Sequence, residues 1–89
     1  MKLKSGIIIS ELNGEFFAVP SGAVGKGFNG MIRMNGTAAF IVKMFQKGAD
    51  EAEIVAALCD TYEVDEAIAR EDYQAVKSQF ESLDFFENE

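Results

Sequence analysis

The period of the hydrophobic pattern changes once along this chain, at Asn35-Gly36. Before that point the apolar residues form short runs typical of β-strands. After it they recur about every 3.6 residues, as in amphipathic helices. A chain that places its strands before its helices is typical of an α+β fold. Its 89 residues suit one domain, so we predict that residues 1–89 form a single domain.

Two strand-like segments, residues 7–12 and 15–19, come before the change of period. They are separated by Asn13-Gly14, a pair that accepts positive φ at both central positions of a tight turn, so a type I′ β-hairpin is predicted. Pro20 is expected to end the second strand, because proline cannot donate a hydrogen bond to a neighbouring strand. Met31–Met34 is predicted as a third short strand.

The connection before the third predicted strand, residues 21–30, contains four glycines. Within it, Gly25-Lys26-Gly27 lacks the Gly-Lys-Ser/Thr ending with which nucleotide-binding loops hold phosphate and magnesium. We therefore predict a mobile connection and no nucleotide site, and the sequence assigns this segment no role.

Three helices are predicted after the change of period. Asn35 or Thr37 caps the first helix, and Gly48 ends it, because glycine accepts the left-handed conformation that follows many helices. The second helix opens at Asp50, and Glu53 follows three residues later, as in a capping box.

The third predicted helix runs from about Glu66 to Leu83. Apolar residues recur in all three helices at the spacing that gathers side chains on one face, and these faces are expected to form the core. Phe85 and Phe86 are expected to fold back as a C-terminal anchor. The residues expected to be buried are Phe40, Ile41, Met44 and Phe45 in the first helix, Ile54, Val55, Leu58 and Tyr62 in the second, and Ile68, Tyr73, Val76, Phe80 and Leu83 in the third.

The charge of the chain is divided unevenly between its two halves. Residues 1–48 carry six basic and two acidic residues, a net charge of +4, whereas residues 49–89 carry two basic and thirteen acidic residues, a net charge of −11. An acidic surface repels the phosphate backbone of nucleic acid, so no nucleic-acid partner is predicted. Two roles for the acids stay open: steering a partner, or keeping a small helical surface soluble.

The chain lacks the residues on which most enzyme and metal sites depend. It contains no histidine, and its single cysteine, Cys59, lies in the apolar pattern of the second helix. The acidic residues between positions 60 and 66 lack the alternating spacing and central glycine of a calcium loop. We therefore predict a protein that is not an enzyme and has no catalytic residues, metal or cofactor.

Composition also bears on the location of the protein. No segment has the roughly 20 apolar residues that span a bilayer, and the N-terminus lacks the apolar core of a signal peptide. A lone cysteine cannot form an intramolecular disulfide, which fits a reducing compartment. A cytoplasmic protein without a membrane partner is therefore expected.

The motifs from the third strand onward follow one another in a specific order. They are Met34-Asn35, Thr37-Ala38-Ala39-Phe40-Ile41, Gly48, Glu53-Ile54-Val55, Leu58, Tyr62-Glu63-Val64-Asp65 and Asp72-Tyr73. Over about Glu15 to Phe86, this arrangement resembles the family of coenzyme pyrroloquinoline quinone synthesis protein D (PqqD), which recurs as the recognition element of enzymes that modify ribosomal peptides. The chain departs from the family pattern at Met34, where leucine is typical, and at Asp84-Phe85, which replace a glycine and a hydrophobic residue.

The resemblance implies a winged helix-turn-helix fold of three antiparallel strands followed by three helices. It also implies a non-catalytic function, in which the domain binds the leader segment of a precursor peptide. The peptide adds to the third strand and lies in the groove against the third helix. A partner enzyme, often a radical S-adenosylmethionine enzyme, then modifies the core part of the peptide.

The peptide site implied by the resemblance combines the third strand with one face of the third helix. An edge strand offers unpaired backbone groups to a peptide, and it can also pair two copies of the chain as a weak homodimer. The first-helix residues from Asn35 to Ile41 are expected to form core and not to contact the peptide. The residues assigned to peptide binding are Met31, Ile32, Arg33, Met34, Asp72, Tyr73, Val76, Lys77 and Phe80.

Some of these assignments have alternatives. A stripe such as Tyr73-Val76-Phe80-Leu83 is more often core than groove, although one helix can serve both. Arg33 either pairs with an acidic peptide residue or protects the edge from self-association. A winged-helix DNA-binding regulator needs a basic recognition helix, but residues 65–83 carry two basic and five acidic residues. A general protein-interaction adaptor would use the same edge and groove.

Overall fold

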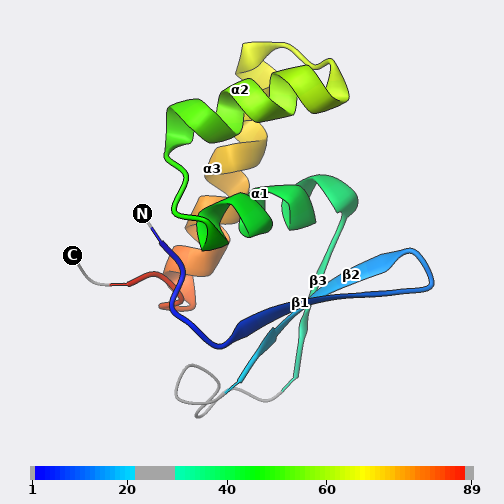
Figure 1. The fold of residues 1–89 in the computed structure, drawn as a ribbon, viewed down its shortest axis with the longest axis vertical. Helices are drawn as coiled ribbons and strands as arrows, with labels where there is room; N and C mark the ends of the chain where they lie inside the picture. The colour runs from blue at the N-terminus through cyan, green and yellow to red at the C-terminus, as the bar shows by residue number, and fades with distance from the viewer. Residues whose placement is uncertain (1, 22–29, 88–89) are drawn as a thin grey trace.

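The computed structural model describes residues 2–21 and 30–87, which form three strands followed by three helices (Figure 1). The connection predicted to be mobile falls on residues 22–29, which lie outside the described residues. The elements are β1 (Ile7–Leu12), β2 (Glu15–Pro20), β3 (Ile32–Met34), α1 (Gly36–Gln46), α2 (Glu51–Tyr62) and α3 (Glu66–Ser82). This order confirms the predicted α+β fold.

The three strands form an antiparallel sheet in the order β1-β2-β3, so β1 and β3 are its two edges. Asn13 and Gly14 have φ angles of 53° and 80°, the positive values that the predicted type I′ turn requires. Two boundaries differ from the prediction. β2 extends to Pro20, which lies opposite Ile7, and β3 begins at Ile32, one residue later than expected. A proline is tolerated there because it is the last residue of its strand.

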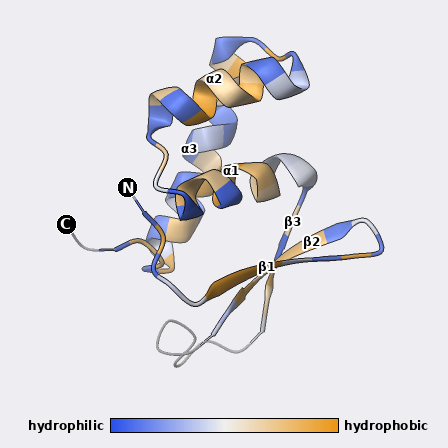
Figure 2. Ribbon diagram, in the orientation of Figure 1, coloured by the Kyte–Doolittle hydropathy of each residue, from blue (hydrophilic) through white to orange (hydrophobic). Residues whose placement is uncertain are grey.

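The helices lie on one side of the sheet, and α1 contacts both β2 and β3 (Figure 1). In β3, Ile32 and Met34 face this side and are buried, whereas Arg33 is exposed on the other side. β1 begins with a strongly hydrophobic segment (Figure 2). Within it Ile7 is buried, but Ile8 is 53% exposed. Within residues 2–21 and 30–87, the sheet is therefore packed on one face.

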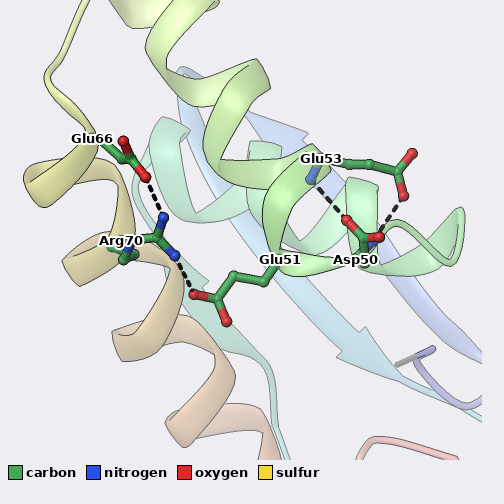
Figure 3. Close-up of polar contacts among 5 residues, drawn as sticks. All are labelled: Asp50, Glu51, Glu53, Glu66 and Arg70. Carbon is green, nitrogen blue, oxygen red and sulfur yellow. Dashed lines mark hydrogen bonds and ion pairs between the residues drawn. The ribbon is translucent and has the colours of Figure 1, made fainter.

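The first two helices begin at predicted capping residues. Asn35, and not Thr37, caps α1, since its Oδ1 accepts a hydrogen bond from the Ala38 N–H at 2.8 Å. At the start of α2 the Glu53 N–H donates to Asp50 Oδ1 at 2.8 Å, and the Asp50 N–H donates to Glu53 Oε1 at 3.1 Å (Figure 3). The predicted capping box is confirmed.

Both α1 and α3 are followed by a residue in the left-handed conformation. Gly48 has a φ of 80° after α1, as predicted, and Asp84 has a φ of 59° after α3. The Asp84 N–H donates to the Glu81 carbonyl at 3.0 Å, and the Phe85 N–H donates to the Phe80 carbonyl at 3.1 Å. These two bonds make a Schellman motif, so Asp84 stands where glycine is usual and pays a steric cost there.

The buried faces of α2 and α3 differ from the prediction at two positions. Tyr62 and Ile68 are 41% and 46% exposed, so their predicted burial is wrong. The small residue Ala69 is buried where Ile68 was expected, because the core face of α3 starts about 100° further round the helix. The buried residues of α3 are Ala69, Tyr73, Val76 and Phe80. The predicted core residues Phe40, Met44 and Leu83 are only partly buried against the core.

The C-terminal residues fold back as predicted, and the N-terminal segment holds them in place. Phe85 and Phe86 are both buried. Leu3 forms an antiparallel bridge with Phe86, and the Lys4 N–H donates to the Phe85 carbonyl at 2.8 Å. The sequence did not indicate this contact between the two ends of the described chain.

Candidate functional site

A groove of about 310 Å³ lies between β3, the first turns of α1, and α3. The residues that line it are Arg33, Met34, Asn35, Thr37, Ala38, Ile41, Asp72, Ala75, Val76 and Gln79. Together these ten residues define the groove.

The strand side of the groove is an open edge. β3 pairs with β2 on one side only, because it is the last strand of the sheet. The other side of an edge strand presents backbone N–H and C=O groups that a further extended chain can pair with. The groove thus combines directional backbone hydrogen bonding with a neighbouring wall of side chains.

The floor of the groove is apolar and belongs to the core. Ile41 and Val76 are 0% and 6% exposed, and Met34 is also buried. Ala38 and Ala75, whose side chains are small, lie in the lining beside them. Because the large side chains are already buried in the free protein, a bound chain would gain chiefly by burying its own apolar side chains here.

The two charged residues of the groove differ in their partners. Arg33 forms an ion pair with Glu15 at 2.5 Å, between two exposed side chains. Asp72 of α3 is half-buried, and no ion pair or hydrogen bond to its carboxylate is found within residues 2–21 and 30–87. Among the described residues, the negative charge of Asp72 therefore has no compensating partner.

The structure brings together four of the nine residues assigned to peptide binding: Arg33, Met34, Asp72 and Val76. Among the others, Met31 is exposed before β3 begins, Ile32 is buried under the sheet, and Lys77 is half-buried away from the lining. Tyr73 and Phe80 are only 3% and 0% exposed, so we place them in the core.

Aromatic contacts explain why Tyr73 and Phe80 face inward. The ring of Tyr73 lies 5.5 Å from that of Phe45, and the ring of Phe80 lies 5.8 Å from that of Phe85 in an edge-to-face arrangement. Burial raises the pKa of the Tyr73 hydroxyl, and the carboxylates of Glu51, Glu81 and Asp50 raise it further. Tyr73 therefore stays neutral inside the core.

Six lining residues were not among the residues assigned from the sequence. The expectation that Asn35 to Ile41 make only core is not met, because Thr37 and Ala38 line the groove. On α3, Ala75 and Gln79 lie three and seven residues after Asp72, a spacing that places them on the same face. That spacing was a readable signal, whereas the contribution of α1 depends on how the helix crosses α3.

The described residues hold no candidate metal site. No group of three or more histidine, cysteine, aspartate or glutamate residues within them could hold a metal ion. Arg70 pairs with Glu66 and with Glu51 (Figure 3), and these two carboxylates raise its pKa.

None of the helices in the described residues combines the length and apolarity of a membrane-spanning segment.

Comparison with known proteins identifies the family. The model of coenzyme PQQ synthesis protein D (PqqD) matches residues 8–84. The chain belongs to the PqqD family. It is also similar to a solved structure described as TbiB1 in complex with the TbiA(beta) leader peptide, with 17% sequence identity and a TM-score of 0.77 over 100% of this chain and 98% of that chain. At this identity the similarity concerns the fold alone. No curated protein matches the chain.

Proposed function

We propose that this PqqD-family protein is a non-catalytic recognition element for a ribosomally made precursor peptide. The leader segment of the peptide adds to β3 as a further strand and packs against α3, and the protein presents it to a modifying enzyme. The observation that carries the proposal is a groove with an apolar floor beside an open strand edge. The family match and the leader-peptide complex of the similar structure support it.

The energetics require both parts of the groove. Each backbone hydrogen bond contributes about 0.5–1.5 kcal/mol net. Ordering a flexible peptide costs about 2–5 kcal/mol or more, which the few bonds of a three-residue strand do not offset comfortably. Each apolar peptide side chain that becomes buried in the groove adds about 1.5–3 kcal/mol. A dissociation constant near 1 μM, equivalent to about −8 kcal/mol, is the expected result.

The partner enzyme in this proposal is a radical S-adenosylmethionine enzyme, which is the class that often accompanies the family. The recognition unit comprises residues 1–89, and catalysis is left entirely to that enzyme. DNA binding is a poor alternative, because α3 is acidic and its residue Arg70 is already held by Glu51 and Glu66.

A titration tests the proposal. The reading frames that neighbour this gene are first searched for a short precursor peptide. The probes are the leader and core halves of that peptide, each carrying a fluorescent label, and binding is followed by anisotropy. We expect the leader half to saturate near micromolar protein while the core half stays free. Failure of the leader half to bind would contradict the proposal. Salt-sensitive binding of a labelled DNA duplex instead would favour a winged-helix regulator.

A further inference from the structure

Ile68 is an exposed aliphatic residue whose position the core does not explain. With about 100° of rotation per residue, Ile68, Asp72, Ala75 and Gln79 fall within a sector of about 60° on α3. The buried residues of the helix fall in the adjoining sector of similar width. Since Asp72, Ala75 and Gln79 line the groove, Ile68 continues the groove side of α3 by one turn. Its side chain is 46% exposed.

The spacing of these positions matches an extended peptide. Four residues along a helix rise about 6.0 Å, and two residues along a strand advance about 6.6–6.8 Å. Side chains of a strand that point to the same face are two residues apart. A peptide lying along α3 therefore brings every second side chain against one turn of the helix, first at Asp72 and then at Ile68.

The chemistry of the two positions defines the side chains that fit them. Asp72 is half-buried and lacks a cationic partner within the described residues, so it favours a lysine or arginine. Ile68 offers an apolar surface, so it favours an aliphatic or aromatic side chain. Arg33 does not compete for Asp72, because its guanidinium is held by Glu15.

We propose that Asp72 and Ile68 are specificity residues, which select a leader peptide with a basic residue and an apolar residue two positions apart. This inference rests on the proposed function and adds the chemical pattern of the peptide. It extends recognition along α3 beyond the segment that pairs with β3, because Ile68 lies outside the groove lining at the α2 end of the helix.

Selection from a peptide library tests the pattern. The probe is a displayed library of random twelve-residue peptides, selected on the wild-type protein and on four variants. We expect wild type to enrich peptides with lysine or arginine and an apolar residue two positions away. Asp72→Lys should reverse the charge preference to aspartate or glutamate, and Ile68→Ser should remove the apolar preference. The controls Glu81→Lys, on the opposite side of α3, and Ile8→Ser, on β1, should select the wild-type pattern.

The affinities of the variants for a selected peptide then distinguish the loss of a peptide contact from the loss of folding. Asp72→Asn should weaken binding about three- to tenfold at low salt and less at high salt, and Ile68→Ser about three- to fivefold. Replacing the partner residue of the peptide by alanine should cost little further in the matching variant. All these side chains are at least partly exposed, and unchanged melting temperatures confirm that the variants fold.

The outcomes distinguish the inference from the proposed function. If Asp72→Lys and Ile68→Ser select the same peptides as wild type, or if the paired substitutions are simply additive, the specificity assignment is overturned. If Ala75→Trp, which fills the groove, still abolishes binding of the selected peptides in that case, the proposed function is retained. If wild type enriches no peptide, the proposed function fails, and the inference fails with it.

Discussion

The two edges of the sheet differ in what lies beside them. β3 borders the groove, whose far wall is formed by α3 and whose floor is part of the core. β1 is twice as long, with six residues against three, and it carries the exposed side chains Ile8 and Leu12. By length and hydrophobicity alone, β1 would be the better edge strand for a peptide to pair with.

Two backbone carbonyls near the start of β1 are already engaged within the protein. A hollow of about 250 Å³ lies at the start of β1, but the Ile7 carbonyl there accepts a hydrogen bond from Gln46 Nε2 at 2.8 Å. The Lys2 carbonyl accepts one from the Glu87 N–H at 2.9 Å. The β3 edge differs because it lies beside a groove whose floor is apolar, and this difference favours β3 as the proposed binding edge.

The largest expected effect is a loss of folding stability, which should be large for a buried residue of α3 and small for an exposed residue of β1. Phe80→Ala should destabilise the fold by about 3–5 kcal/mol, because it removes a completely buried ring and leaves a cavity. Leu12→Ala on β1 should change stability by no more than about 0.5 kcal/mol, because Leu12 is exposed. Urea denaturation measures both. A Phe80→Ala protein of wild-type stability that no longer binds peptide would place Phe80 in the site and not in the core.

Filling the groove tests the difference between the edges directly. Ala75→Trp places an indole in the groove from an exposed helix position, so peptide affinity should fall by a factor of about 30 or more while the fold persists. Ile8→Trp makes a similar change at the β1 edge and should leave affinity unaltered. Equal loss of binding in both variants, measured by anisotropy with the leader peptide, would remove the distinction between the edges.

Two glutamines offer a reciprocal test of intermediate size. Gln46→Ala removes the hydrogen bond to the Ile7 carbonyl and should cost about 0.5–1.5 kcal/mol of stability without changing peptide affinity. Gln79→Ala lies in the groove and should change affinity by about two- to fivefold with little effect on stability. Thermal melting and titration of both variants check the pair, and the reverse pattern would mean that β1 is the binding edge.

The smallest expected effect concerns the end of α3, next to the N-terminal segment. Asp84→Gly should stabilise the fold by about 0.5–1 kcal/mol, because glycine accepts a φ of 59° without the steric cost that aspartate bears. The variant loses the ion pair from Lys4 to Asp84, but exposed pairs of this kind contribute little. Lys4→Gln is the matched control for that loss. A lower melting temperature for Asp84→Gly would show that the ion pair outweighs the strain.

Local rules made much of the fold predictable from the sequence. The hairpin at Asn13-Gly14, the caps at Asn35 and Asp50, and the end of α1 at Gly48 each depend on residues within a few positions of one another. The prediction failed at Ile68, where an isoleucine was assigned to the core and the small residue Ala69 occupies that place. Helical spacing shows that α3 has an apolar face. Which residue lies at the centre of that face depends on how closely the neighbouring helix approaches.

The candidate site was predictable only in part for the same reason. Arg33, Met34, Asp72 and Val76 follow from the two elements that the family pattern indicates. Thr37 and Ala38 enter the groove because α1 crosses beside α3, which is a tertiary contact without a local signature. The ion pair between Arg33 and Glu15 depends on the register of β3 against β2, and within the described residues it leaves Asp72 as the charged groove residue without a partner.

Mapping of backbone amide shifts on addition of the leader peptide tests the central claim most directly, namely that β3 and α3 form the binding site and β1 does not. We expect the largest shifts at Arg33 and Met34, at Thr37 and Ala38, and between residues 68 and 79, with residues 8–12 of β1 nearly unchanged. Largest shifts in residues 8–12, with β3 and α3 unperturbed, would contradict the claim.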